Sequence, residues 1–165
     1  MHKTKQNKHR MIQINHIIVQ YLVLKKIAPP VLQLKKWAKK ALEGQKKGIE
    51  MTIRIVDTQE ITDLNTQYRK KPYATNVLSF PYDISMDLTG EPPLLGDIVI
   101  CAAIVNQEAQ DQGKPATAHW AHMVVHGTLH LLGYDHETLA DANKMEPLEI
   151  KILKELGFPN PYQYR

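Results

Sequence analysis

Hydrophobic and polar positions follow two different periods along the chain, and these separate predicted strands from predicted helices. Residues 16–24 are rich in β-branched and aromatic side chains, and residues 51–55 alternate apolar with polar, so both segments predict strands. Two further apolar runs, 77–80 and 98–102, also predict strands. Helices are expected where apolar residues recur every three to four positions, namely over 30–42, 57–68, 102–113, 116–133 and 138–156.

Capping residues support these boundaries. Asp57 is followed three positions later by Glu60, as in a capping box, and Gly113 and Gly133 suit helix ends. Strands and helices mix without a regular βαβ alternation. We therefore expect an α+β (mixed α/β) fold with a mixed sheet of about four strands flanked by helices. Residues 1–12 are expected to be a disordered basic extension, residues 13–165 a single domain, and residues 83–95 a long loop.

Composition agrees with a folded protein. Of 165 residues, 43% are hydrophobic and 23% charged, which is ordinary for a globular domain. The single cysteine, Cys101, excludes an internal disulfide and favours a reducing compartment. No run reaches the roughly 18 apolar residues that a membrane helix needs. The apolar patch at 17–24 follows a basic start but lacks a cleavage site, so we expect a cytoplasmic protein without a membrane partner.

Charge is unevenly distributed. The net charge is +4, but residues 1–50 hold 12 of the 21 Lys and Arg and only two acidic residues, whereas the rest of the chain is net acidic. A basic first third suits a polyanion such as RNA, because each neutralised phosphate releases counterions. A solvated helix face followed by a flexible tail would give the same counts, so charge leaves both alternatives open.

One short stretch predicts a metal site. His126 and His130 are four residues apart on a predicted helix, so both rings project from one face. Gly133 allows the chain to leave the helix and return His136 towards the same point. Three histidines predict one Zn²⁺ per chain, at the helix end and following turn, with a fourth position open to water as in catalytic sites. His122 lies one turn earlier, where a fourth ligand would close the site; we expect it instead to lie at the surface or to support a ligand without binding the metal.

The same spacing occurs in the zinc-protease signature H-E-x-x-H-x-x-G-x-x-H, with one decisive difference. Gly127 stands where the protease has its general-base glutamate. Without that carboxylate, peptide hydrolysis is disfavoured. Asp135, beside the third histidine, is expected either to orient a ligand imidazole or to cap the next helix.

The full motif, His126-Gly-x-Leu-His130-Leu-x-Gly133-Tyr-Asp135-His136, resembles the signature of the YbeY family of bacterial rRNA maturation endoribonucleases. The resemblance continues in Leu64-Asn65-x-x-Tyr68-Arg69, Thr75-Asn76-Val77-Leu78-Ser79-Phe80 and Leu95-Gly96-Asp97-Ile98, and it covers about residues 50–162. Ala74 departs from the family, which usually has proline there. The resemblance implies a mixed sheet flanked by helices, one zinc held by three histidines, and a cytoplasmic role in 16S rRNA processing and ribosome quality control.

A loop dense in cations follows the second predicted helix, and the resemblance favours a catalytic role for the first of them, Arg69. Arg69 is expected to grip the scissile phosphate, with Lys70 and Lys71 as further RNA contacts and His126 as a catalytic metal ligand. From the residues alone, Arg69 would as readily form a surface salt bridge. The implied partners are the 16S rRNA precursor and the ribosome or small-subunit proteins. Two alternatives remain: a non-catalytic, zinc-stabilised RNA-binding module on the ribosome, and a metalloprotease-like hydrolase.

Overall fold

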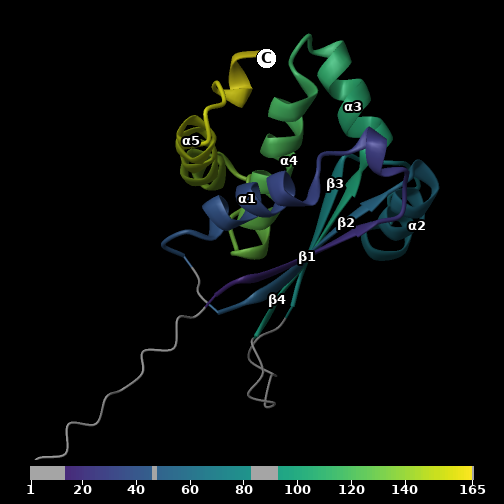
Figure 1. Ribbon diagram of the computed structural model, residues 1–165, viewed down its shortest axis with the longest axis horizontal. Coiled ribbons are helices and arrows are strands. Elements are labelled where there is room, and N and C mark those ends of the chain that lie inside the picture. Colours follow the sequence, from purple (N-terminus) through teal and green to yellow (C-terminus); the bar gives the residue numbers. More distant parts are fainter. Residues whose placement is uncertain (1–13, 46–47, 83–92, 165) are drawn as a thin grey trace, which may run out of the picture.

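Four strands form one mixed sheet at the centre of the computed structural model, which describes residues 14–45, 48–82 and 93–164 (Figure 1). The strands are β1 (His16–Tyr21), β2 (Glu50–Val56), β3 (Val77–Pro81) and β4 (Leu94–Cys101). Their order is β1-β2-β4-β3, with β1, β2 and β4 parallel and β3 antiparallel to β4. This confirms the expected mixed α/β fold with a four-stranded sheet.

The sequence pattern did not predict a βαβ unit, yet β1, α1 (Val31–Leu42) and β2 form one. Two neighbouring parallel strands cannot be joined by a tight turn, so α1 carries the chain back across the sheet. Helix α2 (Thr58–Arg69) then connects β2 to β3. Helices α3 (Ala102–Asp111), α4 (Ala116–Leu131) and α5 (Leu139–Glu155) follow β4.

Helices cover the two faces of the sheet unequally. Helix α2 packs through Ile61 against Val99 and Leu78 on one face, whereas α1, α4 and α5 share the larger core on the other (Figure 1). The larger core contains Ile53 and Ile100 from the sheet. Helix α4 contacts α1, α3, α5, β3 and β4. Side chains on α4 are therefore held by neighbours on several sides, which matters because α4 carries the histidine motif.

Helix ends follow the local signals in the sequence. The Asp57 carboxylate accepts a hydrogen bond from the Glu60 backbone N–H at 2.9 Å, and Thr138 caps α5 by accepting from the Asp141 N–H at 3.1 Å. The predicted extension at 1–12 and most of the predicted loop at 83–95 lie outside the described residues. Within the described ranges, no helix combines the length and apolar character needed to cross a bilayer.

Candidate metal centre and adjoining cleft

The three predicted histidines come together at the end of α4. His126 and His130 lie one turn apart on the helix, and His136 follows the turn after it. Each ring offers a nitrogen within 4.8 Å of the other two, and the Nε2 atoms of His126 and His130 are 3.0 Å apart. Gly133 makes the return possible because its φ of +99° lies in the left-handed region that side chains disfavour.

The second nitrogen of two of these rings is already bonded. His126 Nδ1 lies 3.1 Å from Glu149 Oε1, and His130 Nδ1 lies 2.9 Å from the carbonyl oxygen of Tyr134. A carbonyl and an ionised carboxylate only accept hydrogen bonds, so each Nδ1 carries a proton, and in a neutral ring Nε2 is then left with a lone pair. Two neutral rings would turn these lone pairs towards each other at 3.0 Å, an arrangement that a cation between them stabilises.

The geometry and chemistry of this donor set fit zinc. Ligand atoms about 2.1 Å from a tetrahedral zinc lie roughly 3.3 Å from one another, close to the observed separation of the two Nε2 atoms. Burial and the neighbouring His126 and His136 lower the pKa of His130 to about 4. His130 is therefore neutral at pH 7, as a metal ligand must be.

His119 and His122 are buried, so a surface position for His122, one of its two expected roles, is wrong. His122 Nε2 lies 2.5 Å from Glu149 Oε2, and His119 Nε2 lies 3.2 Å from Glu108 Oε1. His122 is directed at a carboxylate that itself contacts His126. It brings no nitrogen to the group formed by the other three histidines.

Neither predicted role of Asp135 is observed. Its carboxylate accepts a hydrogen bond from the neighbouring His136 backbone N–H at 2.7 Å, and Thr138 rather than Asp135 caps α5. The imidazole contact that was expected of Asp135 is made by the Tyr134 carbonyl on His130 and by Glu149 on His126. The Asp135 carboxylate therefore bonds to the backbone of the turn rather than to a ligand ring.

Sequence reasoning missed Glu149, which is completely buried on α5. Burial raises the pKa of its carboxyl group, but hydrogen bonds from His122 and His126 outweigh that effect and lower the pKa to about 2. A signal was present: Met145, Glu149 and Ile152 recur at helical spacing on the buried stripe of α5. A glutamate on an apolar stripe needs specific partners to be tolerated there.

A cleft of about 920 Å³ opens beside the three histidines. Arg69 and Lys71 line it from the segment at the end of α2, so the structure brings two of the three predicted substrate contacts to the cleft beside the histidines. Lys70 does not line the cleft. It ends α2 in the left-handed conformation, with φ of 58°, and its N–H bonds to backbone carbonyls of α2. Asn76, Ser79, Phe80, Asp135 and Glu137 also line the cleft.

Three polar residues near the cleft have defined structural contacts. Asn65 is buried and donates from Nδ2 to the Tyr73 carbonyl at 2.8 Å, which fixes the loop after α2. Asn76 donates to Glu108 Oε1 at 3.0 Å. Ser79 donates to the Gly127 carbonyl at 3.0 Å and so ties β3 to α4. Asn76 and Ser79 therefore line the cleft while these hydrogen bonds fix their side chains.

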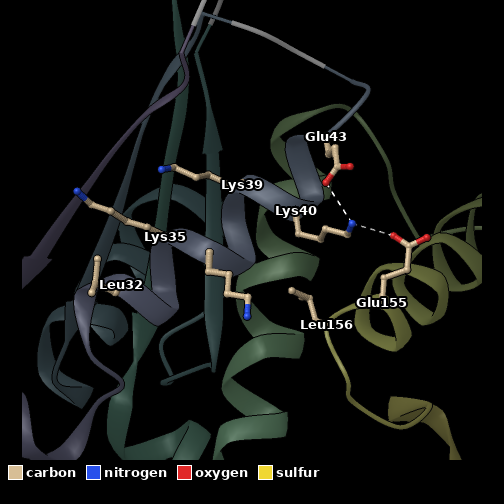
Figure 2. A pocket seen from close by; sticks show the side chains of 8 residues that line it. Leu32, Lys35, Lys39, Lys40, Glu43, Glu155 and Leu156 are labelled. Atoms are coloured by element: carbon tan, nitrogen blue, oxygen red, sulfur yellow. Dashed lines mark ion pairs between the residues drawn. The ribbon is translucent and has the colours of Figure 1, made fainter.

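A second hollow, of about 450 Å³, lies between α1 and the end of α5 (Figure 2). Lys40 bonds to Glu43 and Glu155 there, both at 3.1 Å. Lys35 and Lys39 point away from that group (Figure 2), and in the described part of the chain they form no ion pair. The basic first third thus presents a partly neutralised lysine face, and the structure leaves its predicted RNA contact as a prediction.

Comparisons with known proteins agree with this architecture. The chain is similar to a Thermotoga maritima protein solved in solution, with a TM-score of 0.56 and 23% identity, covering 87% of this chain and 92% of the other. At that identity the likeness concerns the fold alone.

Sequence comparisons find relatives of higher identity, which establish more than the fold. A Nitrosococcus oceani protein named endoribonuclease YbeY is 48% identical over 145 residues, covering 88% of this chain and 95% of the relative. A Pseudomonas putida protein of the same name is 54% identical over 134 residues, covering 81% and 85%. The family model described as endoribonuclease YbeY matches residues 24–157. The chain therefore belongs to the endoribonuclease YbeY family, whose members hydrolyse RNA phosphodiester bonds.

Proposed function

We propose that this chain is a zinc-dependent endoribonuclease that cuts single-stranded RNA. His126, His130 and His136 hold one zinc ion, and Arg69 and Lys71 contact the RNA backbone in the adjoining cleft. The observation that carries the proposal is the convergence of the three histidine rings, with the Nε2 atoms of His126 and His130 3.0 Å apart, beside a cleft lined by cations.

A zinc ion bound there supplies a Lewis acid that polarises a phosphoryl oxygen and makes hydroxide available near neutral pH. The chain's own residues prepare the site for it. The Tyr134 carbonyl and Glu149 orient two of the rings through their Nδ1 atoms, so that the Nε2 atoms converge. The Arg69 guanidinium has the planar two-donor geometry that grips a phosphate and stabilises charge developing at phosphorus. Lys71 adds a point charge, and Lys70 lies exposed next to it outside the cleft.

The biological setting forms a second part of the proposal. We infer that the substrate is the 16S rRNA precursor at its 3′ end, and that the protein acts in the cytoplasm in ribosome biogenesis and ribosome quality control. Ribosomes or small-subunit proteins are the expected partners. Family membership and the charge of residues 1–50 support this part.

The protease alternative is disfavoured by packing at Gly127. A Cβ at that position would lie 3.1 Å from Ile98 Cγ2 and 3.3 Å from Val77 Cγ2. Residue 127 therefore faces the sheet, where a glutamate has no room, rather than the cleft. The position that carries the protease's base is used here to pack α4 against β3 and β4.

The test combines metal content with two substrates. Zinc-loaded wild-type protein should contain one zinc per chain and cleave a labelled single-stranded RNA but not casein. His126→Ala, purified in parallel, reveals any contaminating nuclease and should be inactive. His130→Ala should lose most of its zinc, because two histidines hold the metal poorly. RNA binding without cleavage by the zinc-loaded protein would favour the non-catalytic module, and full zinc content in His130→Ala would refute the ligand assignment.

A further inference from the structure

The buried carboxylate of Glu149 joins α5 to the metal centre on α4. Its Oε1 lies 3.1 Å from His126 Nδ1, and its Oε2 lies 2.5 Å from His122 Nε2 and 2.9 Å from the Tyr162 hydroxyl. The three donors come from two α4 turns and from η3 (Pro161–Tyr164) at the end of the described chain. Glu149 is completely buried, so its carboxylate has lost its contact with bulk water and depends on these internal donors.

We propose that Glu149 is a positioning residue for the metal centre, and that Tyr162 and His122 hold its carboxylate in place. The inference rests on the proposed zinc site. By accepting the Nδ1 proton of His126, Glu149 selects the tautomer in which Nε2 is free to bind the metal, and it sets the plane of the ring. Glu149 touches neither substrate nor metal and acts through His126.

Hydrogen bonding explains these contacts better than a second metal site does. His122, His126 and Glu149 also form a compact group of ligand-type atoms. However, two atoms bound to one tetrahedral zinc lie about 3.3 Å apart, whereas His122 Nε2 and Glu149 Oε2 are 2.5 Å apart. That separation suits a charge-assisted hydrogen bond. The neutral His122 ring then donates from Nε2, and its Nδ1 is a buried acceptor that meets no donor among the residues that the structure describes.

The cost of burying the carboxylate indicates what it does. An ionised carboxylate removed from water is tolerated only when its lone pairs are occupied by donors. Here three donors occupy them, and two come from neighbouring turns of α4. An apolar residue on this stripe of α5 would pack without that cost, so the carboxylate is best explained by the ring that it orients.

Tyr162 lies beyond residues 24–157, the part of the chain matched by the family model. Its ring packs edge-on against His122 with centroids 5.4 Å apart, while its hydroxyl donates to Glu149. The end of the chain therefore contributes to the support of the metal centre. We expect loss of this hydroxyl to loosen Glu149 without removing any zinc ligand.

Zinc affinity tests the proposal directly. The dissociation constant would be measured by competition with a chromophoric chelator for wild type, Glu149→Gln, Tyr162→Phe and the control Glu155→Gln. The control removes an α5 carboxylate that pairs with Lys40 and that does not line the cleft beside the histidines. Circular dichroism of the metal-free proteins checks that each is folded. Gln keeps the shape of Glu149 but turns an N–H₂ group towards donors that need an acceptor.

We expect Glu149→Gln to bind zinc about 10- to 100-fold more weakly, the range found when partners of metal-bound histidines are removed. Tyr162→Phe should show a smaller loss in the same direction, and Glu155→Gln should match wild type. Folded Glu149→Gln with wild-type affinity would overturn the inference while leaving the zinc site intact. Wild-type protein that binds no zinc would overturn the proposed function and the inference together.

If Glu149→Gln does not fold, a measurement on the wild type alone tests the proposed role of Glu149. Long-range ¹H–¹⁵N spectra of the zinc-loaded protein report which nitrogen of each imidazole carries a proton. The proposal requires His126 to be protonated at Nδ1 and metal-bound at Nε2. The opposite assignment, or an Nδ1 proton that exchanges freely with water, would refute it.

Discussion

Substituting Gly127 with alanine has two opposing effects of similar size on the free energy of unfolding. The contacts around residue 127 decide which effect is larger. Alanine in a helix interior is favoured over glycine by about 1 kcal/mol. The new methyl group, however, would lie 3.1 Å from Ile98 Cγ2, 3.3 Å from Val77 Cγ2 and 3.4 Å from Ile98 Cβ. Both neighbours are β-branched residues on strands, and their stiff χ1 angles prevent them from rotating away.

Overpacking of this kind costs about 1–3 kcal/mol, so we expect Gly127→Ala to lower the free energy of unfolding by about 1 kcal/mol despite its helix propensity. In a domain of this size that corresponds to a fall of roughly 3 °C in Tm. Gly127→Glu would add a carboxylate at a buried position. Its cost of several kcal/mol approaches the whole stability of an ordinary domain, so that variant should be largely unfolded and without protease activity.

The assay is urea unfolding of metal-free protein followed by far-ultraviolet circular dichroism, with chelator present because bound metal would add its own stabilisation. Ala118→Gly, at a half-buried position in the first turn of the same helix, measures the propensity difference without the steric contacts and should cost at most about 1 kcal/mol. If Gly127→Ala is more stable than wild type by that amount, the steric argument is wrong. Folded, soluble Gly127→Glu that hydrolyses casein would revive the protease alternative.

Three further predictions concern charge, pH and backbone. Arg69→Ala should slow single-turnover RNA cleavage about 100-fold with zinc content and Tm unchanged, and Arg69→Lys should recover part of the rate; a wild-type rate for the alanine variant would contradict its role. Because the pKa of His130 is lowered to about 4 in the folded protein, the unfolded chain binds more protons between about pH 6.5 and 4. The Tm of metal-free protein should therefore fall as pH drops through that window, and it should fall less steeply in His130→Asn. Identical slopes of Tm against pH in the two proteins would contradict the lowered pKa of His130. Gly96→Ala places a Cβ 2.3 Å from the Phe80 carbonyl oxygen at φ of +147° and should abolish soluble expression, whereas Gly44→Ala, with no atom within 4 Å, should remain soluble at a small cost in Tm.

The convergence of the three histidines could be predicted because their arrangement is local. Residues four apart on a helix share a face whatever the rest of the fold does, and Gly133 permits the reversal that returns His136. The caps at Asp57 and Thr138 are local for the same reason, since each side chain bonds to a backbone N–H three residues away. Short-range geometry was therefore sufficient for the helix ends and for the histidine cluster.

The placement of the proposed substrate contacts required more than local geometry. The resemblance pointed to Arg69, but nothing in the spacing of Arg69, Lys70 and Lys71 distinguishes the residues that line the cleft from the one that does not. The left-handed conformation of Lys70 separates them, and that conformation depends on how the chain leaves α2. The βαβ connection through α1 was likewise unpredicted, because apolar periodicity identifies a strand but not its neighbours.

The support of the metal centre was decided by tertiary structure alone. Glu149 lies 23 residues from His126, and Tyr162 lies 13 residues beyond Glu149, so no period or short motif links them. Sequence shows that a glutamate lies on the apolar stripe of α5 and that such a group needs donors. Which donors it meets depends on the packing of α5 and the end of the chain against α4. The sequence thus determines which groups must find partners, while the packing of distant segments determines which partners they find.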